Sequence, residues 1–246
     1  METKFGHYDF VVEPFEEDIT GTLSWGTLGN LILRSASLHA GQHGFGFSDV
    51  NTRSYAWVLS RLVIEMHNMP KMFDRYAVET WVSRVYRQFT DRHFDVLSST
   101  GECIGQATSI WALIDINSRT PADLSSMAND EFSKVMLPER EIQIAGPSRI
   151  KLSKEAPLLY THKAAYSDLD INGHVNSIRY IELLLDTFSL ELFKNNPPKR
   201  VDVAYCLESY CGESLDIYGE RVNDTTYAFE IRREQSVIVK ALISVS

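Results

Sequence analysis

Two copies of one short motif, each placed directly before an apolar helix pattern, constrain the fold of this chain more than any other feature. The first copy, DITGTLSWGTL, begins at Asp18, and the second, DINGHVNSIRY, begins at Asp170. In an alignment without gaps the aspartate, the isoleucine and the glycine coincide, and a leucine of the first copy stands where the second has a valine. A match at the same place in both halves indicates an internal duplication.

The first half combines one helix pattern with several strand patterns. Apolar residues recur at spacings of three and four from Trp25 to about His39, which predicts an amphipathic helix. The stretch 52–66 is predicted to begin as helix and to pass into strand. Segments rich in β-branched and aromatic residues predict antiparallel strands: 7–15, 77–86, 91–99 and 103–116.

An irregular connection separates the two halves. Charges, Gly146 and Pro147 interrupt the regular pattern between residues 137 and 159. This interruption predicts two domains, an N-terminal domain of residues 1–146 and a C-terminal domain of residues 147–246.

The second half repeats the order of the first. A short strand is predicted to end near Tyr166, and an apolar stripe predicts a helix over 175–194, which the following prolines terminate. Further segments predict four strands: 201–209, 214–222, 225–233 and 237–246. The predicted fold class is therefore α+β, with a helix and an antiparallel sheet in each half.

Composition narrows the class of protein. The chain has 246 residues, of which 44% are hydrophobic and 23% are charged, as in ordinary soluble globular proteins. A net charge of −9 disfavours nonspecific nucleic-acid binding, which needs a basic surface. No long apolar run, secretory signal or transit peptide is evident, so we expect a cytoplasmic protein that does not insert into membranes. The cysteines lack CxxC spacing, which favours free thiols over disulfides or a zinc site: Cys103, Cys206 and Cys211.

The second copy of the motif carries polar groups that the first lacks. Asn172, His174 and Asn176 stand where the first copy has threonine or serine. A helix N-terminus presents unpaired N–H groups and a partial positive charge, which can stabilise an oxyanion, and Gly173 permits close approach. Together with the carboxylate of Asp170, these groups suit acyl transfer to water. A helix with ordinary polar caps explains the same pattern, and the residues alone leave both interpretations open.

The motif resembles D-x-x-G-H-V-N-x-x-x-Y, the signature of hotdog-fold thioesterases. The wider run YSDLDINGHVNSIRYIELLLD is similar to that of the fatty acyl–acyl carrier protein thioesterases, as is the segment 80–125 with its TGE turn and Trp-bearing strand. The resemblance implies two tandem hotdog domains, each a sheet wrapped around a long central helix. It also implies hydrolysis of the thioester between a fatty acyl chain and the phosphopantetheine of acyl carrier protein, without metal or cofactor. A chain without a transit peptide would be a bacterial-type member, with its acyl pocket in the N-terminal domain.

The resemblance also assigns roles to residues. The Asp, Asn and His of the family motif fall on Asp170, Asn172 and His174, and the Glu of a downstream Y-R-R-E-C strand falls on Glu208. The cysteine of that strand is replaced by Ser209, which argues against a cysteine nucleophile. We expect Glu208 to deprotonate water, and His174 to orient or polarise it. Asn172, with a backbone N–H at the helix start, would hold the oxyanion, while Asp170 would position Asn172 or the loop. In the alternative mechanism, known from single-hotdog enzymes, Asp170 is the nucleophile or base.

Two further residues of the motif, Asn176 and Tyr180, lie four residues apart on one helix face and are expected to brace the site or cap the helix. Other functions remain open: an acyl-CoA thioesterase, a non-catalytic acyl-binding protein, or a dehydratase-like protein. The sequence is also compatible with a homodimer.

Overall fold

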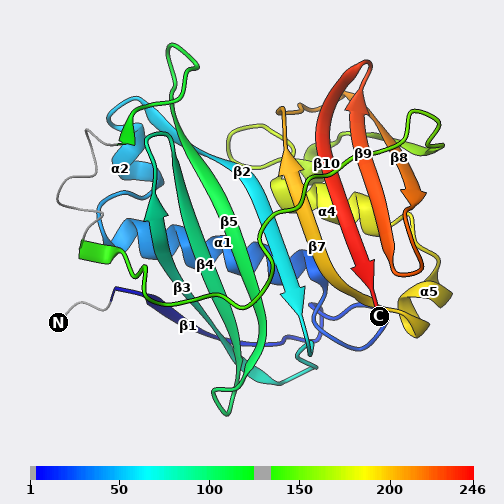
Figure 1. The fold of residues 1–246 in the computed structure, drawn as a ribbon, viewed down its shortest axis with the longest axis horizontal. Coiled ribbons are helices and arrows are strands. Elements are labelled where there is room, and N and C mark those ends of the chain that lie inside the picture. Colours follow the sequence, from blue (N-terminus) through cyan, green and yellow to red (C-terminus); the bar gives the residue numbers. More distant parts are fainter. Residues whose placement is uncertain (1–3, 125–133) are drawn as a thin grey trace.

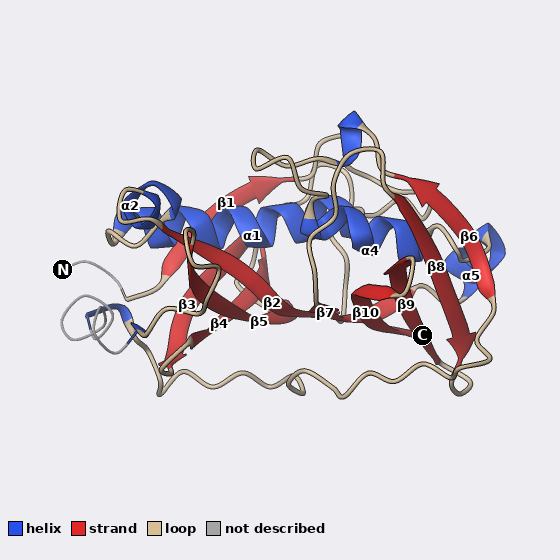
Figure 2. Cartoon of the chain, turned by 90° about the horizontal axis from the view of Figure 1, so that it is seen from above, coloured by secondary structure: helices blue, strands red, loops and turns tan. Residues whose placement is uncertain are grey.

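A computed structural model describes residues 4–124 and 134–246 of the chain. Its described strands form one antiparallel sheet in the order β1-β3-β4-β5-β2-β7-β10-β9-β8-β6 (Figures 1 and 2). The first half supplies β1 Gly6–Val11, α1 Trp25–Gln42, α2 Phe47–Asn51, β2 Tyr55–Met66, β3 Arg75–Val85, β4 Phe89–Ser98 and β5 Cys103–Asp115. The second half supplies β6 Leu158–Lys163, α4 Ser177–Leu185, α5 Leu190–Asn195, β7 Pro198–Tyr205, β8 Ser214–Arg221, β9 Thr226–Arg233 and β10 Ser236–Val245.

The two halves are joined through the backbone at the middle of the sheet. Strands β2 and β7 pair in antiparallel register from Arg61 opposite Ala204 to Glu65 opposite Arg200. The last pair is also an ion pair, with 2.7 Å between Arg200 Nη1 and Glu65 Oε2. The sheet is therefore continuous across the duplication.

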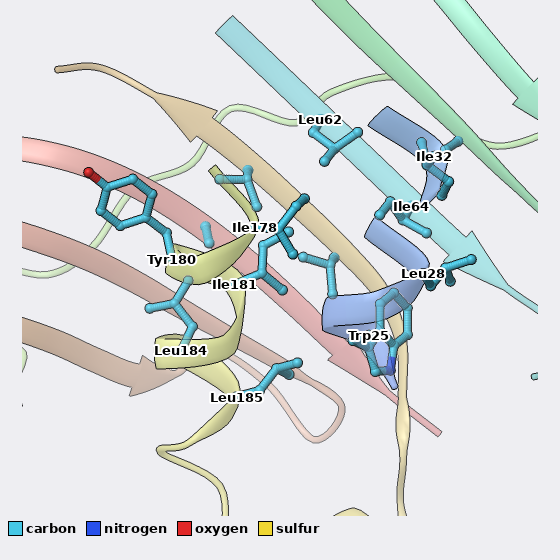
Figure 3. Packing of buried hydrophobic residues seen from close by; sticks show 14 of the residues in the cluster. Trp25, Leu28, Ile32, Leu62, Ile64, Ile178, Tyr180, Ile181, Leu184 and Leu185 are labelled. Atoms are coloured by element: carbon cyan, nitrogen blue, oxygen red, sulfur yellow. The ribbon is translucent and has the colours of Figure 1, made fainter. Parts of the chain in front are cut away.

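The sheet curves around α1 and α4, which lie on the same side of it (Figure 2). Small residues let the two helices approach closely, because a Cβ on Gly29 would lie only 2.8 Å from Cδ1 of Ile178. One core cluster spans both halves, and side chains of α1, β2 and α4 meet in it (Figure 3). Burial of this apolar surface is the main term that stabilises both helices on the sheet.

The connection between the halves crosses the opposite face of the sheet (Figures 1 and 2). It is held there by polar contacts, including a hydrogen bond of 2.7 Å from the backbone N–H of Ser148 to the buried carboxylate of Asp202. The predicted domain boundary between residues 146 and 147 falls in this connection and stays a prediction.

Much of the predicted secondary structure is confirmed. Helix α1 begins at Trp25 as predicted and runs three residues past His39. Strands β3, β4, β5, β8, β9 and β10 lie within two residues of their predicted ranges. The first strand is shorter than the predicted 7–15, since β1 ends at Val11, and β6 ends at Lys163, before Tyr166.

Three predicted elements were wrong in part. The stretch 52–66 has no helical start, because the short helix α2 ends at Asn51 and β2 begins at Tyr55. The strand predicted over 201–209 ends at Tyr205, where the chain leaves the sheet. The helix predicted over 175–194 is divided into α4 and α5.

The break between α4 and α5 combines two local hydrogen bonds with one contact to the sheet. The Thr187 hydroxyl donates to the carbonyl of Leu184 at 2.7 Å, and the Ser189 hydroxyl caps α5 by accepting from the N–H of Leu192. Short polar side chains of this kind compete with helical backbone bonds. Between them Phe188 turns onto the sheet, with its ring 4.9 Å from that of Tyr227.

Candidate active site

The loop before α4 is organised by the carboxylate of Asp170. Its Oδ1 accepts hydrogen bonds from the backbone N–H groups of Asn172, at 2.8 Å, and His174, at 3.1 Å. Gly173 between them has a φ of +76°, a left-handed conformation that favours glycine. The carboxylate therefore fixes the path of the chain on which Asn172 and His174 are placed.

The start of α4 leaves one donor at the site. Asn176 is the N-cap, and its Oδ1 accepts the N–H of Ile178 at 2.8 Å. The N–H groups of Val175 and Asn176 are bound to carbonyls of neighbouring segments. Within the described part of the chain, the N–H of Ser177 makes no hydrogen bond. Ser177 also lines the cleft described below, so this N–H is available to a ligand.

A buried carboxylate supports the loop from behind. Asp168 is 2% exposed and accepts hydrogen bonds of 2.7 Å each from His162, from the N–H of Ala165 and from Arg179. Burial would raise the pKa of Asp168, but the hydrogen bonds of His162, Ala165 and Arg179 outweigh it and keep this pKa below its ordinary value. Asp168 is thus an ionised support of the motif.

A cleft of about 520 Å³ lies between the two halves. Four of the predicted site residues line it together: Asp170, Asn172, His174 and Glu208. Tyr180 also lines it, whereas Asn176 and Ser209 are not among its lining residues. The opposite wall comes from the first half, through α2, β2 and the end of β5, including Phe47, Trp57 and Arg119. The site is therefore shared by both halves.

Glu208 lies in the loop after β7 and is surrounded by polar groups. Its Oε2 lies 2.7 Å from Nη2 of Arg119, 3.2 Å from the hydroxyl of Tyr210 and 3.7 Å from Nε2 of His174. Burial alone would raise the pKa of Glu208, but the hydrogen bond from Arg119 and the electrostatic influence of the neighbouring His174 and Arg119 hold it below its ordinary value. Glu208 is therefore ionised at neutral pH.

Sequence reasoning missed Arg119. It belongs to the turn after β5, where Asp115 accepts the N–H groups of Asn117 and Ser118 and Arg119 itself has a φ of +58°. This turn directs the guanidinium of Arg119 across the cleft to Glu208, 89 positions away in sequence. No pattern local to either segment signals such a pair.

Both halves of the chain are similar to known proteins. Residues 4–132 match the acyl-ACP thioesterase N-terminal domain, and residues 152–244 match the acyl-ACP thioesterase C-terminal domain. The chain belongs to the acyl-ACP thioesterase family. The resemblance found in the sequence and the predicted double hotdog fold are confirmed.

Solved and curated members of the acyl-ACP thioesterase family are similar over most of this chain. An acyl-ACP thioesterase from Bacteroides thetaiotaomicron is 41% identical, with a TM-score of 0.92 over 99% of this chain and 98% of that one. The fold is shared with a 12:0-ACP thioesterase from Umbellularia californica, 19% identical, at a TM-score of 0.89 over 100% of this chain and 98% of that one. Oleoyl-acyl carrier protein thioesterase 2 from Arabidopsis thaliana is 29% identical over 88% of this chain. The chain spans 63% of the length of that curated relative.

This member of the family has no cysteine suited to nucleophilic attack in the cleft. Ser209, which the sequence resemblance matches to a cysteine, is fully buried, and its hydroxyl lies near that of Tyr180, whose pKa burial raises to about 12. Cys206 does line the cleft, but burial raises the pKa of its thiol, so it is not a thiolate at neutral pH.

Among the described residues, no three His, Cys, Asp or Glu side chains are grouped so that they could hold a metal ion. None of the described helices combines the length and the apolar character needed to cross a bilayer.

Proposed function

We propose that this protein hydrolyses the thioester of fatty acyl–acyl carrier protein, releasing free fatty acid and ending chain elongation. The observation that carries this proposal is the shared cleft, in which an ionised Glu208 lies 3.7 Å from His174, on the side of the cleft that carries Asn172. The similar protein from Bacteroides thetaiotaomicron is named an acyl-ACP thioesterase, which supports the same substrate class here.

The proposed reaction begins with a water molecule between Glu208 and His174. Two atoms 3.7 Å apart are too distant for a direct hydrogen bond, but one water can bridge them. His174 orients the water, and Glu208 takes a proton from it. At the same time the water oxygen forms a bond to the thioester carbon. A thioester carbonyl is electrophilic enough for a carboxylate base to suffice.

The negative charge then develops on the carbonyl oxygen. The side-chain amide of Asn172 and the N–H of Ser177 are donors on the cleft wall that can stabilise it, assisted by the partial positive charge of the α4 N-terminus. When the intermediate collapses, the C–S bond breaks, and the sulfur receives the proton held by Glu208. The products are a fatty acid and the carrier thiol.

Asp170 is proposed as a positioning residue. Its Oδ1 already accepts two backbone N–H groups of its own loop, which supports a role in placing Asn172 and His174. The alternative, in which Asp170 attacks the thioester or deprotonates water, would use its other oxygen, Oδ2, which accepts a hydrogen bond of 3.4 Å from the side-chain amide of Asn172.

The acyl chain is proposed to occupy the first half. A second cavity of about 140 Å³, between α1, α2 and the sheet, shares Phe47 and Trp57 with the cleft. A chain attached to a thioester at Glu208 could extend past these two rings into the cavity. The carrier protein is the proposed partner; the cytoplasmic location and a homodimer stay predictions.

The test is release of free thiol from acyl-ACP and acyl-CoA of several chain lengths. We expect hydrolysis that favours the carrier-protein substrate and falls by about 10²–10⁴-fold in Glu208→Gln. Glu65→Gln is the matched control, because Glu65 is also paired with an arginine at 2.7 Å and is 29% exposed, against 27% for Glu208. Hydrolysis of acyl-CoA but not of acyl-ACP would show that the substrate is an acyl-CoA thioester. No thiol release by the folded protein would leave an acyl-binding or dehydratase role.

A further inference from the structure

The cavity in the first half has apolar walls and one charged residue. Apolar side chains of α1, the following loop and the sheet line most of it, among them Ala36, Phe45, Val82 and Trp111. The side chain of Arg92, on β4, reaches the same cavity although the residue is only 5% exposed. A hydrocarbon chain alone gives no reason for a guanidinium at this place.

Arg92 has polar neighbours but no carboxylate partner among the described residues. Its Nη1 lies 3.1 Å from Nδ1 of His39 and 3.1 Å from the hydroxyl of Thr80, both fully buried. Burial first, and then the charge of Arg92, lower the pKa of His39 to about 3, so the imidazole is neutral. Burial lowers the pKa of Arg92 only to about 10, so the guanidinium keeps its charge at neutral pH.

The other partly buried arginines among the described residues have a counter-ion. Each forms an ion pair with a carboxylate: Arg61, Arg140, Arg179, Arg200, Arg232 and Arg233. No such pair joins Arg92 to a carboxylate of the described residues. A buried charge without a partner is costly, so an oxygen of a bound ligand would offset part of the cost of burying Arg92.

A hydroxyl completes the polar corner of the cavity. Thr90, two residues before Arg92 on β4, lines the same cavity and is 5% exposed. Its hydroxyl forms no hydrogen bond with a described residue, so it can donate to or accept from a ligand. Arg92 and Thr90 together offer donors in otherwise apolar surroundings.

We propose that this corner selects acyl chains that carry an oxygen far from the thioester, as a terminal hydroxyl or carboxylate. The inference rests on the proposed function, because the acyl chain must enter the cavity from the cleft. The oxygen accepts a hydrogen bond from Arg92, and the remaining chain packs against the apolar walls past Phe47 and Trp57. Arg92 is thus a specificity-determining residue.

The experiment compares acyl-ACP substrates of equal chain length with a methyl, a hydroxyl or a carboxylate at the far end, in a series of lengths. We expect kcat/KM at one length to be about tenfold higher for an oxygenated chain than for the unsubstituted one. A preference for the hydroxyl or for the carboxylate identifies which oxygen is bound. Equal rates, or a preference for the methyl end at every length, would overturn the proposal while the thioesterase function stands.

Variants connect the preference to the cavity. Arg92→Met should lose the preference, and Thr90→Val should reduce it. Thr108→Val is the matched control, because Thr108 is equally buried, at 5%, and does not line the cavity. If Arg92→Met does not fold, the wild-type series and Thr90→Val decide the question. A preference that survives in both variants would overturn the assignment to Arg92 and Thr90.

Failure of the proposed function gives a different pattern. In that case no acyl-ACP is hydrolysed, and the same intact substrates serve as ligands in calorimetric titration. Tighter binding of an oxygenated chain than of the unsubstituted chain, lost in Arg92→Met, would still support the pocket. Equal binding would overturn it.

Discussion

In both halves of the protein an aspartate holds the turn that leads into the central helix. Asp18 accepts the N–H of Thr20 at 2.8 Å, and Asp170 accepts the N–H of Asn172 at 2.8 Å. The backbone N–H of each aspartate donates a hydrogen bond to the carbonyl of the residue four positions later, Thr22 or His174. The following glycines and helix caps also correspond: Gly21 and Gly173, with φ of +73° and +76°, and Ser24 and Asn176.

A second pair of loops extends the correspondence. In the first half the N–H groups of His67 and Asn68 both donate to one carbonyl of β5, and in the second half those of Cys206 and Leu207 both donate to one carbonyl of β10. The next residue along each loop is Met69 in one half and Glu208 in the other. The thioether of Met69 thus stands where the candidate base stands in the second half.

The difference between the halves separates scaffold from chemistry. The first half keeps the aspartate, the glycine and the helix cap, although it has Thr22 and Met69 in place of His174 and Glu208. The turn is therefore present in both halves, although only the second carries the candidate catalytic groups. This supports the proposal that Asp170, like Asp18, positions its loop.

The strongest test makes the second half resemble the first. Glu208→Met should lower kcat by about 10³-fold, since the base is removed. The melting temperature should change little, because Met69 occupies the corresponding loop position. An assay of thiol release measures kcat, and thermal denaturation measures the melting temperature. The converse variant, Met69→Glu, should gain no second site; retained activity in Glu208→Met would refute the assignment of the base.

The aspartates can be compared by matched substitutions. Asp170→Ala and Asp18→Ala should each reduce the free energy of unfolding by about 1 kcal/mol, because each loses a carboxylate acceptor of the turn. Only Asp170→Ala should also lower kcat, on the order of 10²-fold, through misplacement of Asn172 and His174. Asp170→Asn keeps an acceptor oxygen and should retain most of the activity, measured by thiol release. If Asp170→Asn were as inactive as Asp170→Ala, a nucleophile or base would be the better role.

Arg119 can be tested through the pH dependence of the reaction. The folded-state pKa of Glu208 is lowered, so its ionised form persists until pH falls through that lowered value. Arg119→Met removes the main cause of the lowering, and the acid limb of the kcat/KM profile should move to higher pH. Any stability that the Arg119–Glu208 ion pair contributes is fully present above the pKa that Glu208 has in the unfolded protein. It is lost as pH falls through the lower pKa that Glu208 has in the folded protein.

The control for this prediction is Arg221→Met. Arg221 is 55% exposed, close to the 60% of Arg119, and is paired with Asp224 away from the cleft. It should leave the acid limb in place. An acid limb that is the same in Arg119→Met and in the wild type would show that Glu208 does not set it.

The smallest expected effect concerns the two glycines. Nothing lies within 4 Å of the position of a Cβ on Gly21 or on Gly173, so alanine at either site meets no clash and only the positive φ opposes it. Each substitution should cost about 1 kcal/mol of unfolding free energy, measured by urea denaturation. A clearly larger cost at one site would show that the two turns are less alike than their backbones indicate.

Sequence patterns predicted elements that local periodicity controls. The spacing of apolar residues places the start of α1 at Trp25, and the alternation in β9 is readable from Tyr227 onward. The division of the second helix depends on Phe188, whose ring packs on residues of β9 distant in sequence. Periodicity could not show this, because Phe188 also fits the apolar stripe.

The candidate site was predictable to the same extent. Asp170, Asn172 and His174 lie in one contiguous motif, and Glu208 was placed by family resemblance; all four line one cleft. Arg119 was not predictable, because its position depends on how the first half docks against the second. The strand predicted through Glu208 ends at Tyr205, after which the N–H groups of Cys206 and Leu207 both donate to the carbonyl of Ile238.

The pairing of β2 with β7 has a genetic consequence. Where two identical subunits build such a sheet, every substitution appears in both and must suit both. Here the two units are one polypeptide, so a substitution enters one of them only. One copy can lose its imidazole while the other retains it, and the copy released from catalysis can change its interior one residue at a time.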